Sequence, residues 1–297
     1  MTRLRERLSQ PGTIIADGAS GTMLQAAGLP PGIAPEYWNL VKPAEIRALH
    51  QAYVDAGCDI VLTNTFGASG IRLQEANLGD RTYEINLAAA KLARQVANDK
   101  TLVLGDIGPT GQLLEPLGRL SIEEVTATFA EQATYLAEGE VDGILIETMS
   151  DLEEAVAAVK GAKRVTKLPI LVSMSFDSRG RTMMGIKPED AAIRLWGLGV
   201  DVIGANCGRT LSETLEAVTK MRQAVPHAIL LAKPNAGLPH EKDGKSIYDV
   251  SPHMMAEYAM EFVKLGVKIF GGCCGSTPKH IEAVIEALRG PERQERV

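Results

Sequence analysis

Three of the four cysteines have a type and spacing that suit metal binding. Cys207 follows an apolar run, and Cys273 and Cys274 are adjacent in a Gly-Gly-Cys-Cys-Gly segment. Three thiolates favour a soft or borderline metal, usually Zn²⁺. The flanking glycines let the backbone turn so that adjacent side chains reach one ion, which regular strand alternation would prevent. The alternative is that these cysteines are small buried hydrophobic residues.

A zinc ion held by these three residues would have a restricted chemistry. Three protein ligands leave the fourth position open, which is typical of a catalytic site. With three thiolates the centre has a net charge of about −1, so it is a weak Lewis acid and activates water poorly. It can bind a substrate thiol and remove its proton. Thiol alkylation is the reaction that matches such a site.

Eight short apolar runs, each followed by a helical pattern, must position these residues. The runs are nearly continuous in Val, Ile and Leu, as in strands buried on both faces. Amphipathic stretches at 44–57 and 121–139 lie between runs, and the second begins with a Ser121/Glu124 capping box. The first turn, DGASGTM, does not match a GxGxxG fingerprint, so we predict one (β/α)8 TIM barrel over residues 1–297. The predicted strands are Thr13–Ala16, Asp59–Thr63, Leu102–Gly105, Gly143–Ile146, Pro169–Met174, Val200–Gly204, Ala228–Ala232 and Val267–Phe270.

The carboxyl ends of barrel strands face a common mouth, where active sites lie. Cys207 ends the sixth strand and the Cys273–Cys274 pair ends the eighth, so we expect them to meet across the seventh. Cys58 begins the second strand at the opposite end and is expected to pack in the core. The long connections at 22–43, 66–81, 106–121 and 233–250 are candidate lids.

Four amides and carboxylates at other strand ends leave two interpretations open. Asn64, Asp106 and Asn206 line the mouth or satisfy loop backbone. The Asn235 amide fills the fourth zinc position or stabilises the seventh loop.

Seven segments of the chain resemble the homocysteine S-methyltransferase family: DGASGT, LTNTFGA, GDIGPTG, LIET, ANCG, PNAG and GGCCGSTP. The resemblance spans residues 12–289. GDIGPTG together with PNAG is more similar to the homocysteine module of cobalamin-dependent methionine synthase than to betaine- or S-methylmethionine-using relatives. The resemblance implies a (β/α)8 barrel, zinc bound by Cys207, Cys273 and Cys274, and homocysteine as the acceptor that becomes methionine.

The resemblance also implies how homocysteine is held. Asp17 and Glu147 would bind its amino group, and backbone N–H groups of the first turn would bind its carboxylate. An ammonium group suits paired carboxylates, and a Gly-rich turn forms an anion-binding nest. The alternatives are that Asp17 forms a turn and that Glu147 caps a helix. The residues of this turn that follow Asp17 are Gly18, Ala19, Ser20, Gly21 and Thr22.

The methyl donor is left open by the residues themselves. Because we see no folate or cobalamin module in the chain, we expect methylcobalamin on a separate corrinoid protein. The alternative is S-methylmethionine or betaine, whose cation Tyr37, Trp38 and Phe66 could cradle. A non-catalytic zinc-binding scaffold is a third interpretation.

The composition excludes two classes of partner. The net charge is −6 and no Lys/Arg cluster is present, so nucleic acid and anionic membranes are not expected partners. No apolar run is long enough to span a bilayer, and the N-terminus has no signal-like apolar segment. We therefore expect a cytoplasmic protein.

Overall fold

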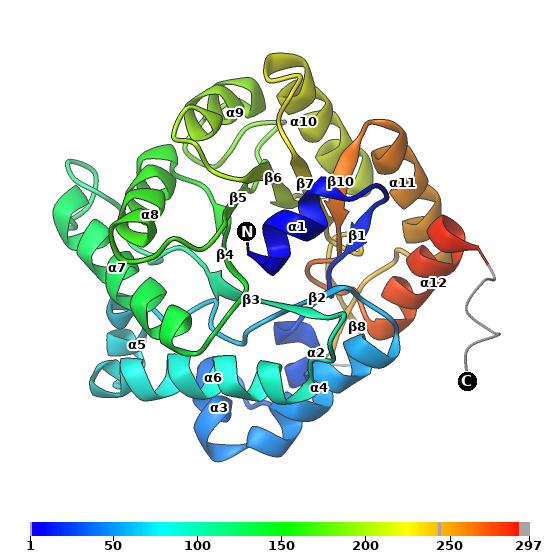
Figure 1. Cartoon of the computed structure of the whole chain (residues 1–297). Coiled ribbons are helices and arrows are strands. Elements are labelled where there is room, and N and C mark those ends of the chain that lie inside the picture. The colour runs from blue at the N-terminus through cyan, green and yellow to red at the C-terminus, as the bar shows by residue number, and fades with distance from the viewer. Residues whose placement is uncertain (1, 243–244, 291–297) are drawn as a thin grey trace.

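The computed structural model describes residues 2–242 and 245–290. Eight parallel strands form one sheet, and Figure 1 shows it as a ring with helices outside. A parallel bridge between Ala16 and Ile60 joins the first strand to the last in the sheet order. This confirms the (β/α)8 barrel. Around the ring the strands are β1 (Ile14–Ile15), β10 (Val267–Phe270), β7 (Leu230–Pro234), β6 (Val202–Cys207), β5 (Ile170–Met174), β4 (Gly143–Met149), β3 (Leu102–Ile107) and β2 (Ile60–Leu62).

The outer helices follow from the amphipathic stretches in the sequence. The stretch at 44–57 forms a helix that buries Ile46, Leu49 and Tyr53. The predicted capping box of residues Ser121 and Glu124 is present in full. The helices of the ring and its connections are α2 (Gly21–Ala26), α3 (Trp38–Val41), α4 (Pro43–Asp55), α5 (Gly70–Glu75), α6 (Thr82–Val96), α7 (Ile122–Glu138), α8 (Leu152–Val165), α9 (Pro188–Trp196), α10 (Leu211–Ala224), α11 (Pro252–Lys264) and α12 (Pro278–Arg289).

Each strand contributes to two cores because successive side chains alternate between its faces. Ile14 lies in the cluster inside the barrel, whereas Ile15 packs in the cluster between strands and helices. Burial on both sides explains why the strands read as continuous apolar runs.

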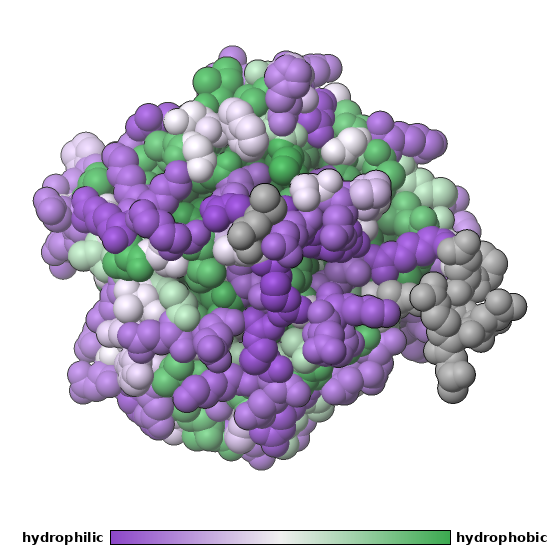
Figure 2. Space-filling view, viewed as in Figure 1, coloured by the Kyte–Doolittle hydropathy of each residue, from purple (hydrophilic) through white to green (hydrophobic). Residues whose placement is uncertain are grey.

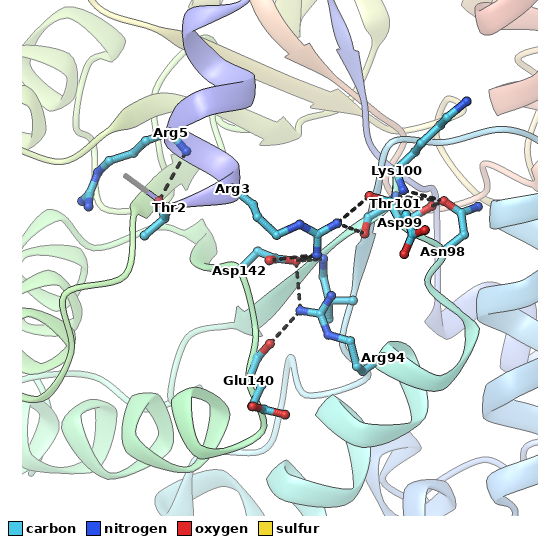
Figure 3. A network of polar contacts seen from close by, with 11 residues as sticks. Thr2, Arg3, Arg5, Arg94, Asn98, Asp99, Lys100, Thr101, Glu140 and Asp142 are labelled. Carbon is cyan, nitrogen blue, oxygen red and sulfur yellow. Dashed lines mark hydrogen bonds and ion pairs between the residues drawn. The ribbon is translucent and has the colours of Figure 1, made fainter.

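A helix that the sequence analysis did not predict, α1 (Arg3–Ser9), covers the amino-terminal ends of the strands. Its Leu4 and Leu8 join the cluster inside the barrel. Figure 1 shows α1 across the ring, and Figure 3 shows Arg3 and Arg94 around Asp142 beneath it. α1 therefore closes the end of the barrel opposite the mouth.

The 233–250 connection contains a short hairpin that was also not predicted. It consists of β8 (His240–Lys242) and β9 (Lys245–Ile247). Two 3₁₀ turns, η1 (Pro35–Tyr37) and η2 (Gly79–Arg81), lie in the 22–43 and 66–81 connections.

The face that carries α1 is largely hydrophilic, with scattered apolar residues (Figure 2). Within residues 2–242 and 245–290, no helix has both the length and the apolar character that a membrane span requires.

Candidate functional site

The mouth of the barrel brings the three predicted cysteines together. β7 lies between β6 and β10, and the sulfur atoms of Cys207, Cys273 and Cys274 lie within 4.8 Å of one another. A tetrahedral zinc ion about 2.3 Å from each sulfur would place the sulfurs roughly 3.8 Å apart, so the trio fits that ion. Among the described residues, this is the one group of three His, Cys, Asp or Glu side chains arranged to hold a metal.

The backbone around these cysteines is held in unusual conformations. Cys207 has a φ of +56° although it is not glycine, and Gly275 has a φ of +79°. The Cys273 N–H donates to the Pro234 carbonyl at 2.9 Å, which fixes the pair against β7. A Cβ atom at Gly272 would overlap Ser276, so only glycine fits before the pair. A left-handed non-glycine residue is strained, and such strain is concentrated at functional sites.

Asn206 is the immediate neighbour of the thiols. Its Nδ2 lies 3.7 Å from the Cys207 sulfur and 3.8 Å from the Cys273 sulfur, while also donating to Thr148 Oγ1 at 2.7 Å. Its Oδ1 accepts from the Thr148 N–H and from Ser173. This amide therefore braces β4 and contacts the sulfurs, but it is not among the residues that line the cavity.

The three thiols are close enough to hydrogen-bond to one another. Cys207 and Cys273 sulfurs lie 2.9 Å apart. Hydrogen bonds from Cys207 and Cys273 lower the pKa of Cys274 well below the usual thiol range. The pKa of Cys207 is raised, mainly by its hydrogen bonds to the other two thiols.

Cys58 lies away from the trio, in the core between strands and helices. Burial raises the pKa of its thiol well above the usual value. This matches its expected packing role.

A cavity of about 320 Å³ lies in front of the thiols. Its size falls within the range of small-molecule sites. The lining residues come from the ends of seven strands and their loops: Gly18, Ala19, Ser20, Gly21, Thr22, Pro35, Glu36, Leu62, Thr63, Asn64, Thr65, Phe66, Asp106, Glu147, Thr148, Cys207, Lys233, Gly272, Cys273 and Cys274.

Asp17 is buried directly behind this wall, next to the lining Gly18. Its Oδ2 accepts the Leu62 N–H at 2.8 Å, and its Oδ1 is buried without a hydrogen-bond partner among the described residues. Burial raises the pKa of Asp17 to about 7, against the opposing effect of Lys233.

Glu147 faces a residue to which the sequence analysis gave no role. Lys233, at the end of β7 and 2% exposed, donates to Glu147 Oε2 at 2.7 Å. Burial raises the pKa of Glu147, and the Lys233 charge opposes this rise. The sequence signal that could have identified Lys233 was its place at a strand end in the KPNAG segment. Its partner Glu147, however, is 86 residues away in the chain.

The turn after β1 is held by hydrogen bonds from the loop that follows β10 and from α4. The Ala19 N–H donates to Ser276 Oγ at 3.1 Å, and Tyr53 Oη donates to the Ala19 carbonyl at 2.9 Å. No acceptor for the N–H groups of Ser20, Gly21 and Thr22 is found in the described parts of the chain. Three of the expected N–H donors are therefore free, whereas that of Ala19 is engaged.

The amides at the second and seventh strands brace loops. Asn64 Nδ2 donates to the Pro35 carbonyl and to Asn39. Asn235 Nδ2 donates to the Gly208 carbonyl at 2.7 Å, and its Oδ1 is buried without a partner among the described residues.

The aromatic residues considered for a cationic donor have different surroundings. Phe66 lines the cavity, Trp38 is 6% exposed, and Arg81 already covers the Tyr37 ring at 5.8 Å. Of these three aromatic residues, Phe66 is the one that lines the cavity.

Glu36 is a further residue that the sequence analysis missed. It lines the cavity from the first loop and accepts the Gly67 N–H at 2.6 Å. Burial raises the pKa of its carboxyl group.

Comparison with known proteins agrees with this geometry. A family model described as homocysteine S-methyltransferase matches residues 14–288. The methionine synthases of Mycobacterium tuberculosis (strain ATCC 25618 / H37Rv) and Mycobacterium leprae (strain TN) are each 33% identical to the chain, over 315 and 308 residues. These matches cover 99% and 97% of this chain but 26% and 25% of the relatives, so the chain spans about a quarter of their length.

Solved structures show the same fold. The metallated form of the homocysteine methyltransferase MmuM from Escherichia coli has a TM-score of 0.80 at 22% identity, covering 95% of this chain and 98% of that chain. Its apo form has a TM-score of 0.74 at 23% identity, covering 96% and 99%. The family model spans nearly the whole chain, and the chain belongs to the homocysteine S-methyltransferase family.

Proposed function

We propose that this chain transfers a methyl group to the thiol of L-homocysteine, giving methionine. The observation that carries the proposal is the convergence of three thiols within 4.8 Å on the wall of a cavity that also has buried carboxylates. Family membership supports homocysteine as acceptor. A zinc ion held by Cys207, Cys273 and Cys274 would bind the substrate thiol and remove its proton, so that the sulfur is nucleophilic at neutral pH.

The remaining site residues would orient the amino acid. Asp17 and Glu147 would attract its ammonium group, and the free N–H groups of Ser20, Gly21 and Thr22 would bind its carboxylate. Gly18 and Ala19 would shape this turn, because a Cβ atom at Gly18 would lie 2.6 Å from Ser276 Oγ. Holding the ammonium and carboxylate groups, which share one carbon, would fix that end of the substrate and direct its sulfur toward the thiols, which favours in-line attack on a methyl group.

Asn235 would provide the fourth ligand before substrate binds. Its unpartnered, buried Oδ1 supports this role, and its Nδ2 contact with Gly208 keeps the loop in place at the same time. Substrate sulfur would then replace this oxygen.

The methyl donor would be a methylated corrinoid, methylcobalamin, carried by a separate protein. The GDIGPTG and PNAG segments support this choice through their similarity to the cobalamin-dependent module. The engaged Tyr37 face and the buried Trp38 argue against a cradle for S-methylmethionine or betaine. The methyl group would leave its donor without the bonding electrons and form its new bond with the electron pair of the homocysteine sulfur.

Donor assays with zinc-loaded protein test this proposal. L-homocysteine is incubated with methylcobalamin, S-methylmethionine or betaine, each with a deuterated methyl group, and methionine is measured by mass spectrometry. We expect labelled methionine from methylcobalamin, no product with Cys207→Ala, and unchanged product with Cys58→Ala. Product from either onium donor instead would overturn the donor assignment. A protein that binds zinc tightly but does not bind homocysteine would favour the alternative of a non-catalytic zinc-binding scaffold.

A further inference from the structure

Three buried carboxylates, two on the wall of the cavity and one behind it, share a single buried lysine. Asp17, Asp106 and Glu147 are 1%, 5% and 6% exposed, and Lys233 is the cation whose charge acts on all three. Its ion pair goes to Glu147 Oε2. A buried carboxylate without a compensating cation or donor is costly, so this cluster has room for one more cation.

Asp106 is the carboxylate with the fewest partners. Its backbone is fixed, since its N–H donates to Thr63 and its carbonyl accepts from Thr65. Its side chain, in contrast, has no hydrogen bond to any part of the chain that the structure describes, and its Oδ1 is fully buried. Asp106 lines the cavity, whereas Asp17 lies behind the wall. Within the described residues, this carboxylate therefore braces no other element by a hydrogen bond.

Lys233 determines which carboxylate oxygens remain available. By engaging Oε2 of Glu147, it leaves the other oxygen of that group without a hydrogen bond among the described residues. Burial and the charge of Glu147 raise the pKa of Asp106 well above its usual range. A bound cation would offset both the cost of burial and the repulsion between Asp106 and Glu147.

We propose that Asp106 is a substrate-binding residue whose Oδ1 accepts the ammonium group of the amino-acid thiol, so that the site selects thiols that carry an amino group. This inference rests on the proposed function. Asp106 and Glu147 receive the ammonium group from two sides, Asp17 supports it from behind the wall, and Lys233 holds Glu147 in position.

Two thiols that differ only in the amino group test the proposal. L-homocysteine and 4-mercaptobutanoic acid share the thiol, the carboxylate and the chain length. Their binding to zinc-loaded protein is measured by titration calorimetry for the wild type and Asp106→Asn. We expect the substitution to weaken homocysteine binding about 10- to 100-fold, as for a charge-assisted hydrogen bond. The affinity for 4-mercaptobutanoic acid should change by less than about twofold.

Asp177→Asn is the matched control, because Asp177 also follows a barrel strand but does not line the cavity. It should leave both affinities unchanged. If Asp106→Asn weakens both ligands equally, or neither, the inference is overturned while homocysteine binding stands. If neither thiol binds the wild type, the proposed function itself fails.

Asp106→Ser is measured alongside, with circular dichroism and zinc content for each variant. If Asp106→Asn disturbs the fold, the affinities of Asp106→Ser for the two thiols test the proposal instead. Loss of fold or zinc in both variants would make Asp106 a structural residue and would contradict the proposal.

Discussion

The two ends of the barrel treat the acidic residues at strand ends in opposite ways. At the closed end, Asp59, Asp142 and Asp201 each precede a strand, and each accepts a backbone N–H of the neighbouring strand and an arginine. At the mouth, Asp106 has no side-chain partner among the described residues, and Asp17 has one backbone donor. Satisfied groups stabilise a fold, while unsatisfied ones await a ligand. The closed end therefore satisfies its carboxylates within the fold, and we infer that the mouth leaves its carboxylates available to a ligand.

The cysteine trio should give the largest effect. Cys273→Ala leaves two thiolates, and we expect zinc to fall from one ion per chain to near zero, with methyl transfer reduced at least about 1000-fold. Metal content is measured by mass spectrometry after dialysis. Cys58→Ala, in the core, should retain full zinc. Equal zinc in both variants would contradict the assigned ligands.

Removing a buried side chain from the closed end should affect stability alone. Leu4 of α1 is 0% exposed, and Leu4→Ala should lower the free energy of unfolding by about 2–5 kcal/mol. Urea unfolding measures this loss, and zinc affinity should stay at the wild-type value. A large change in zinc affinity with little loss of stability would break the division between the two ends.

The same chemical change should have opposite signs at the two ends. Asp142→Asn removes the charge that pairs with Arg3 and Arg94, so we expect the free energy of unfolding to fall by about 1–3 kcal/mol. Asp17→Asn removes a carboxylate whose pKa is raised to about 7 in the folded state, so the metal-free protein should gain stability at pH 8.

The sign follows from proton linkage. The folded state binds the Asp17 proton more tightly than the unfolded chain, whose pKa is near 3.8. Asp17 therefore lowers the stability progressively as the pH rises from about 4 to about 7. The free energies of unfolding of the metal-free wild type and of Asp17→Asn should be equal near pH 4 and should differ by pH 8. A variant that is less stable than the wild type at pH 8 would show that Asp17 is structurally satisfied.

The smallest effect should come from a half-exposed ion pair at the closed end. Arg5 pairs with Asp201 at 2.7 Å, but its side chain is 41% exposed. Arg5→Gln should cost about 0.2–1 kcal/mol, because solvent screens the pair. Thermal unfolding in low and high salt checks this, and the difference between the two proteins should shrink in high salt.

The fold and the thiol trio were predictable because both depend on short-range patterns. Buried parallel strands read as continuous apolar runs, and strand order then placed Cys207 beside Cys273 and Cys274. α1 was missed because its only buried residues are Leu4 and Leu8, within a highly charged segment. Its helical structure depends on packing against the amino-terminal end of the barrel, which α1 closes, and this is a tertiary effect.

The charge balance of the mouth was not predictable for a similar reason. Lys233 and Glu147 lie on β7 and β4, and the sequence does not tell which strand-end side chains meet across the barrel. Likewise, the Ala19 N–H was expected to be free, but it donates to Ser276, which is 257 residues away in the sequence.

Zinc-edge X-ray absorption of the purified protein, with and without L-homocysteine, tests the central claim most directly. We predict a shell of three sulfurs and one light atom that becomes four sulfurs when homocysteine is added. A protein that retains no zinc, or a shell that is unchanged by homocysteine, would contradict thiol activation at Cys207, Cys273 and Cys274.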